Sequence, residues 1–163
     1  RPWHAPAPKP DGTTEMKTVV LGIGNLIMQD EGVGVRVVEA LQRDHAMPDG
    51  VTLIDGGTSA MEMLDELSDL DHLIVVDAIN AGKPPGTLLR IEGEDVPSFF
   101  RTRLSPHQIG LPDVMASLEF LGAQPKKMVI LGVQPQTMEL GLELTPVVAA
   151  QVPALVRQVL AEI

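Results

Sequence analysis

Three side chains of this sequence could form one catalytic or metal-binding centre, namely Glu31, Asp77 and His107. Two carboxylates and one imidazole suit zinc, nickel and similar borderline metals, and three protein ligands leave coordination positions open for water or substrate. A carboxylate near such a metal, either Asp77 or Asp55, could also act as a general base. The three residues are far apart in the chain, so no local ligand motif marks them and only the fold can bring them together.

The positions of these residues relative to the predicted strands favour a shared site. In an open parallel sheet, ligands bind beyond the carboxyl ends of the strands. Asn25 follows the first predicted strand, Asp55 ends the second and Asp77 ends the third, while Glu31 opens the first predicted helix. His107 falls in an irregular segment that could close over the same crevice.

Each candidate also has an ordinary structural interpretation. Glu31 could be a favourable negative charge in the first turn of a helix, and its neighbour Asp30 could be an N-cap. Asp77 could cap a turn, although a carboxylate directly after an apolar run needs a cation, hydrogen-bond donors or a raised pKa. A single loop histidine such as His107 is most often a surface residue. The residues by themselves therefore leave the metal site as one of several interpretations.

The GIGN segment at residues 22–25 suggests a dinucleotide-binding turn, with Asp55 where a ribose-binding acid would lie. The third glycine of that fingerprint is missing, because position 27 is isoleucine, and the predicted helix begins several residues too late. The fingerprint is therefore incomplete, and the sequence does not favour a dinucleotide cofactor.

Charge and composition exclude several classes of protein. A net charge of −10 argues against nucleic acid as a partner. The chain has no cysteine, so it has no disulfide and no thiolate nucleophile or metal ligand. Its apolar runs are far shorter than the roughly 20 residues that cross a bilayer, and residues 1–10 lack the apolar core of a secretory signal. We expect a cytoplasmic protein without membrane insertion.

The chain predicts one domain at residues 16–163, preceded by a flexible extension or cloning remnant at residues 1–15. Strand and helix patterns alternate, which indicates an α/β fold with a largely parallel sheet. Strands are predicted at residues 17–22, 51–54, 73–76, 87–91 and 127–133, the fourth as an edge strand reached by a hairpin. Helices are predicted at about residues 32–45, 58–70 and 112–121 and from residue 145 onward, with a kink at Pro153 and a loop at residues 98–112.

Four segments of the chain share their pattern with one family. They are GIGNLIMQDEGVG at residues 22–34, DGGT at 55–58, HLIVVDAI at 72–79 and SPHQIGL at 105–111. They resemble the G-x-G-N-x-x-x-x-D-E-x-x-G opening, the second-strand turn, the third strand and the histidine loop of the [NiFe]-hydrogenase maturation endopeptidases. The resemblance spans essentially residues 17–161.

The resemblance implies a fold, a reaction and a set of site residues. The fold would be a three-layer α/β/α sandwich around a twisted, mostly parallel five-stranded sheet. Enzymes of this family remove the C-terminal extension of the hydrogenase large-subunit precursor once nickel has been inserted. Glu31, Asp77 and His107 would then be the metal ligands, and the expected metal is nickel carried by the substrate.

Two rival functions and one mechanistic choice stay open at this point. The chain could be a non-catalytic nickel-state sensor or chaperone for the immature subunit, or a nucleotide-binding α/β enzyme. In the peptidase interpretation, the metal could activate the attacking water. It could instead serve only as an anchor, while Asp77 or Asp55 acts as the general base.

Overall fold

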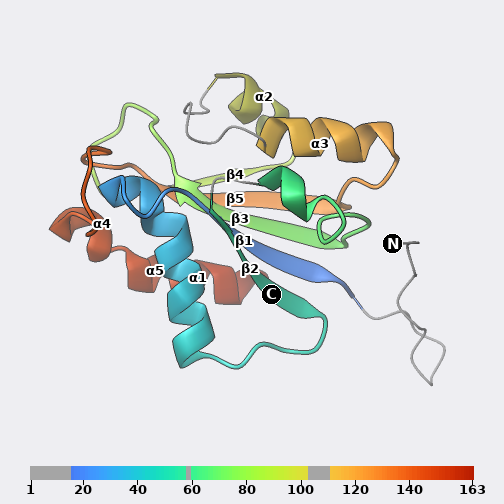
Figure 1. Ribbon diagram of the computed structural model, residues 1–163, viewed down its shortest axis with the longest axis horizontal. Helices are drawn as coiled ribbons and strands as arrows, with labels where there is room; N and C mark the ends of the chain where they lie inside the picture. The colour runs from blue at the N-terminus through green and yellow to red at the C-terminus, as the bar shows by residue number, and fades with distance from the viewer. Residues whose placement is uncertain (1–15, 58–59, 103–110) are drawn as a thin grey trace.

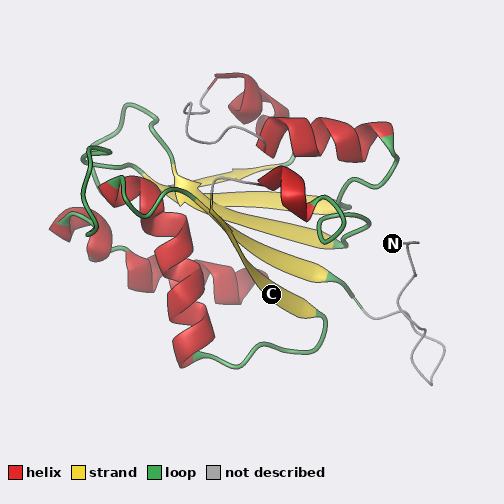
Figure 2. Cartoon of the chain, viewed as in Figure 1, coloured by secondary structure: helices red, strands yellow, loops and turns green. Residues whose placement is uncertain are grey.

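The computed structural model describes residues 16–57, 60–102 and 111–163, which form a five-stranded sheet with helices on both faces (Figure 1, Figure 2). The strands are β1 (Thr18–Ile23), β2 (Val51–Gly57), β3 (His72–Ala78), β4 (Leu88–Glu92) and β5 (Lys127–Val133). Their order across the sheet is β2-β1-β3-β5-β4. All neighbours are parallel except β4, which runs antiparallel to β5. The predicted fold class is confirmed.

The sheet separates two hydrophobic layers. Every residue of β1 and β3 is buried, as expected for central strands that are covered on both faces. Side chains alternate along a strand, so Ile74 and Val76 contact one layer and Leu73 and Val75 contact the other. The first layer is covered by α1 (Val33–Asp44) and α5 (Val152–Glu162), and the second by α2 (Asp95–Thr102) and α3 (Leu111–Phe120) (Figure 1).

Most predicted elements are present, with small differences at their ends. The first helix is α1, but a 3-10 turn, η1 (Gln29–Gly32), precedes it and contains Glu31. The predicted kink at Pro153 is instead a break between α4 (Pro146–Ala149) and α5, where the proline occupies the first turn of the new helix. The fourth strand is an edge strand as predicted. The predicted hairpin is wrong, because β4 pairs with β5 and not with the preceding strand β3.

Two further predictions of local structure are wrong. The predicted helix at 58–70 is absent from residue 60 onward, where only the 3-10 turn η2 (Ala60–Met63) and further turns are found. Asp69 has a positive φ of 57° there, which a continuous helix does not allow. In contrast, α2 occupies part of the predicted loop, because Val96 and Phe99 lie one helical turn apart and are both buried against the sheet. The rest of that loop, residues 103–110, lies outside the described residues, as does the predicted extension at residues 1–15.

None of the helices in the described part of the chain is long and apolar enough to span a membrane.

Candidate active site

The structure brings Glu31 and Asp77 together at the carboxyl ends of the central strands. Asp77 is the penultimate residue of β3 and lies opposite Gly132 of β5, and the turn η1 that carries Glu31 packs against β3. The two acids are almost completely buried, with exposed fractions of 1% for Glu31 and 2% for Asp77. Two neighbouring buried carboxylates are rare in a protein interior unless they serve a function or hold a cation.

Glycines place Glu31 at this position. A Cβ on Gly24 would lie 1.7 Å from the carbonyl oxygen of Glu31, and Gly24 has a φ of +140° that other residues rarely adopt. A Cβ on Gly34 would lie 2.1 Å from the carbonyl oxygen of Val76. The glycine-rich opening therefore lets η1 and the start of α1 approach the ends of β1 and β3 closely, which explains the motif without a bound nucleotide.

The environment of Asp77 favours its protonated form. Burial, and secondly the negative charge of Glu31, raise the pKa of the Asp77 carboxyl well above its usual range. The backbone N–H of Ala78 donates to Asp77 Oδ1 at 2.8 Å and opposes this shift only in part. Asp77 is therefore suited to take up and release a proton, or to be held ionised by a cation.

The third predicted ligand, His107, lies outside the described residues. Its segment follows α2 and precedes α3, the two helices that cover the sheet face shared by Leu73, Val75 and Asp77. Within the part of the chain that the structure describes, no group of three histidine, cysteine, aspartate or glutamate side chains could hold a metal ion. The structure therefore brings two of the three predicted ligands together, and their role as metal ligands stays a prediction.

Asp55, the other predicted catalytic candidate, has a different environment. It lies on β2 level with Gly22 of β1, at the same end of the sheet, but its side chain is exposed. Its Oδ1 accepts the backbone N–H of Gly57 at 3.0 Å and so supports the end of β2, where Gly57 has a positive φ of 49°. The structure does not bring Asp55 into the buried acid pair.

Two buried polar residues that the sequence interpretation did not assign to the site hold its loops in place. Asp30, with no exposed surface, accepts the backbone N–H groups of Gln136, Thr137 and Thr145 at 2.8 to 3.1 Å. The N-cap interpretation of Asp30 is therefore wrong, since neither η1 nor α1 has a side-chain cap hydrogen bond. Gln134 accepts the N–H groups of Ala81 and Lys83 at 2.7 and 3.2 Å. The sequence contained a signal for Gln134, because this polar residue directly follows the apolar strand β5. The same kind of position, at the end of an apolar strand, identified Asp77.

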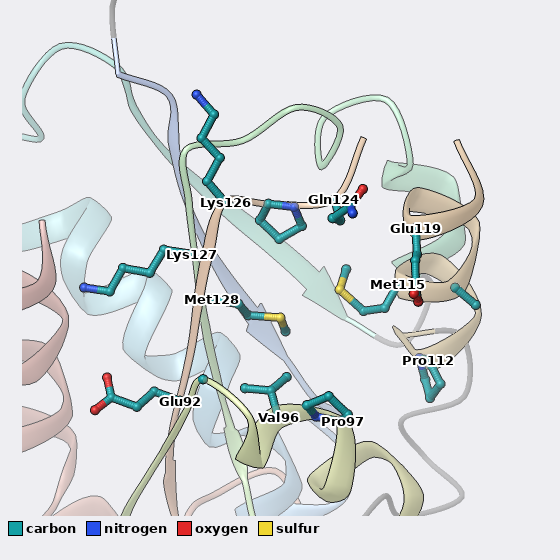
Figure 3. Close-up of a pocket in the computed structure, with 13 residues that line it drawn as sticks. Glu92, Val96, Pro97, Pro112, Met115, Glu119, Gln124, Lys126, Lys127 and Met128 are labelled. Carbon is teal, nitrogen blue, oxygen red and sulfur yellow. The ribbon is translucent and has the colours of Figure 1, made fainter. Parts of the chain in front are cut away.

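A hollow of about 800 Å³ opens between α2, α3 and the start of β5. Figure 3 shows the side chains that line it. It is bordered by Val96 and Pro97 of α2, by Met115 of α3, and by Lys127 and Met128 at the start of β5. The start of β5 is the opposite end of the sheet from Asp77. The acid pair therefore lies outside this hollow.

The chain is similar to several known proteins. The model of the hydrogenase maturation protease family, HycI, matches residues 35–162. Hydrogenase 2 maturation protease of Escherichia coli (strain K12) is 46% identical over 147 residues, which is 90% of each chain. Hydrogenase expression/formation protein HupD of Bradyrhizobium diazoefficiens is 42% identical over 158 residues, covering 94% of this chain and 82% of HupD.

Solved structures agree with these matches. The hydrogenase maturating endopeptidase HybD from Escherichia coli has a TM-score of 0.86 at 44% identity, covering 90% of this chain and 91% of HybD. A hydrogenase 2 maturation peptidase from a Thaumarchaeota archaeon has a TM-score of 0.66 at 29% identity, covering 90% of this chain and 97% of the other.

The protein is an endopeptidase, because its α/β domain, with a buried acid pair at the strand ends, matches these maturation proteases in sequence and in fold. The chain belongs to the hydrogenase maturation protease family. This membership confirms the resemblance seen in the sequence. It also decides against the nucleotide-binding enzyme and the non-catalytic chaperone as its function.

Proposed function

We propose that this endopeptidase removes the C-terminal extension of a [NiFe]-hydrogenase large-subunit precursor that already holds nickel, and that Glu31, Asp77 and His107 contact this nickel. The observation that carries the proposal is the buried Glu31–Asp77 pair in a chain of this family. The negative charge of Glu31 raises the proton affinity of Asp77, and a divalent cation between the two carboxylates would stabilise both in their ionised form.

The composition of the site supports nickel carried by the substrate. Carboxylate and imidazole are harder ligands than thiolate, and the chain contains no cysteine. Such a site can contact a nickel ion that thiolates of the precursor hold, without removing it. Nickel then positions the scissile bond, and positioning alone can lower a reaction barrier by several kcal/mol.

Cleavage also needs proton transfers that Asp77 can perform. In its ionised form, Asp77 accepts a proton from a water molecule whose oxygen forms a bond to the scissile carbonyl carbon. The same proton can then pass to the leaving nitrogen as the C–N bond breaks. Asp55 is the second candidate for this base, although its exposed carboxylate accepts a hydrogen bond from Gly57.

Cleavage of two precursors by chelator-treated enzyme tests the role of nickel. We expect the nickel-loaded precursor to be shortened on a gel and the nickel-free precursor to stay intact. Equal cleavage of both would contradict nickel recognition. Activity that returns only when zinc is added to the enzyme would indicate a conventional metallopeptidase, in which the metal activates the water.

Substitutions test the residue assignments. Glu31→Gln, Asp77→Asn and His107→Ala should each lower the cleavage rate at least about 100-fold, since general-base and metal-positioning effects have this size. Glu66→Gln, at an exposed acid after η2, is the matched control and should cleave normally. Asp55→Asn keeps the oxygen that accepts the Gly57 N–H but removes the charge, so normal cleavage by this variant would exclude Asp55 as the base. Fractionation of cells would test the cytoplasmic location predicted from the sequence.

A further inference from the structure

Three large apolar side chains are exposed on the segment that leads into Glu31 and on the loop that follows β5. The exposed fractions are 50% for Ile27, 77% for Leu140 and 69% for Leu142. We call these three residues the apolar patch. Exposed apolar side chains that gather in one place on a soluble protein often mark an interaction surface.

Backbone pairing brings the three residues together although more than a hundred positions separate them in the chain. Gln29 N–H donates to the carbonyl of Gly141 at 3.0 Å, and Gly141 N–H donates to the carbonyl of Ile27 at 2.9 Å. Met28 and Gly141 form a parallel bridge. These hydrogen bonds place Ile27 beside Gly141, so Ile27, Leu140 and Leu142 lie on adjacent segments of the surface.

The apolar patch is held rigidly next to the catalytic region. Arg36 Nη2 donates to the carbonyl of Leu142 at 2.9 Å, and Asp30 binds the backbone of the same loop at Gln136, Thr137 and Thr145. Ile27 lies only four positions before Glu31. A surface that is already ordered loses little conformational entropy when a partner binds to it.

Charges around the apolar patch indicate the chemistry of its partner. The two leucines stand between Glu139 and Glu143, both exposed. The nearby Arg36 is paired with Glu39, with Nη1 and Oε2 at 3.2 Å, so it does not offset these two acids. A partner segment with apolar side chains flanked by lysine or arginine would therefore be complementary to this surface.

We propose that the apolar patch binds a segment of the hydrogenase large-subunit precursor, with apolar side chains between basic ones, while the acid pair contacts the nickel. This inference rests on the proposed function. A single metal contact fixes one point of the substrate and leaves the polypeptide free to rotate about it. A second contact beside Glu31 sets the direction in which the precursor crosses the site.

The test is the cleavage kinetics of the full-length enzyme with the nickel-loaded precursor. Leu140→Gln/Leu142→Gln should raise KM about tenfold or more and leave kcat within about twofold, because two of three apolar anchors are lost. The matched control is Phe120→Gln/Leu121→Gln, which changes two exposed apolar residues, 90% and 61% exposed, at the end of α3. This control should match the wild-type enzyme.

The charge part of the inference has its own variant. Glu139→Gln/Glu143→Gln should raise KM and reduce the dependence of KM on salt concentration. Melting temperatures of all variants should equal that of the wild type, since none of the changed side chains is buried.

The outcomes separate this inference from the proposed function. If the wild-type enzyme cleaves the precursor and the double-leucine variant has the same KM, the docking surface alone is overturned. A loss confined to kcat would likewise overturn it, because that result means a structural effect of the loop on the acid pair. If KM and its salt dependence are unchanged in the glutamate variant, the inference that basic residues flank the bound segment is overturned. If the wild-type enzyme does not cleave the nickel-loaded precursor, the proposed function fails and this inference fails with it.

Discussion

Replacement of Asp30 by alanine should destabilise the protein by about 4 kcal/mol, without any change in the hydrophobic core. The buried Asp30 carboxylate accepts three backbone N–H groups and the Thr145 hydroxyl. A hydrogen bond to a charged group contributes about 1.5 to 3 kcal/mol when buried, and less when the donor can turn to water. These donors are only partly buried, so about 1 kcal/mol for each of the four donors is the appropriate size. The loss would be a large fraction of a typical stability of 5 to 15 kcal/mol.

A graded series measured by urea denaturation would test this number. Asp30→Asn keeps one acceptor oxygen and should lose about 2 kcal/mol, and Thr145→Val removes only the hydroxyl and should lose about 1 kcal/mol. Glu119→Ala, an exposed acid on α3, is the control and should change stability by less than about 0.5 kcal/mol. The amides of Gln136, Thr137 and Thr145 should exchange with solvent faster in Asp30→Ala. A loss below about 1 kcal/mol in Asp30→Ala would refute the reasoning, because water would then replace the carboxylate at little cost.

Three further predictions concern stability. In chelator-treated protein, Asp77→Asn should raise the melting temperature measured by scanning calorimetry. The substitution removes a buried carboxyl group whose pKa is raised by burial and by the charge of Glu31. A lower melting temperature would contradict this prediction. Burial, and secondly Lys127, lower the pKa of His72, so the unfolded chain takes up a proton there before the folded protein does. The free energy of unfolding should therefore fall as pH drops below about 6.5, and His72→Gln should weaken this dependence in urea titrations at several pH values. Deletion of residues 1–15 should change neither melting temperature nor cleavage rate, since this segment lacks apolar periodicity, and a clear loss of either would show that it docks on the domain.

The sequence by itself determined the elements whose pattern is local. The β-branched runs of β1, β3 and β5 and the helical spacing of α1 are complete within a few residues, so strand and helix periods identified them. Asp77 was recognised for the same reason, because a carboxylate at the end of an apolar strand is visible in the local sequence without knowledge of its contacts. These elements were enough to predict a mostly parallel sheet and the strand ends at which the acids lie.

Tertiary structure decided what depends on residues far apart in the chain. The role of Asp30 requires donors that lie 106 to 115 positions later, and no local pattern contains them. The antiparallel partner of β4 is β5, which follows it in the sequence only after α2 and α3. Helix α2 forms because Val96 and Phe99 pack into the hydrophobic layer on the sheet. The same holds for the apolar patch, because the bridge between Met28 and Gly141 brings the segment of Ile27 next to that of Leu140 and Leu142. Hydrogen bonding and burial between distant segments override local preference at these places, which is why only the folded chain reveals them.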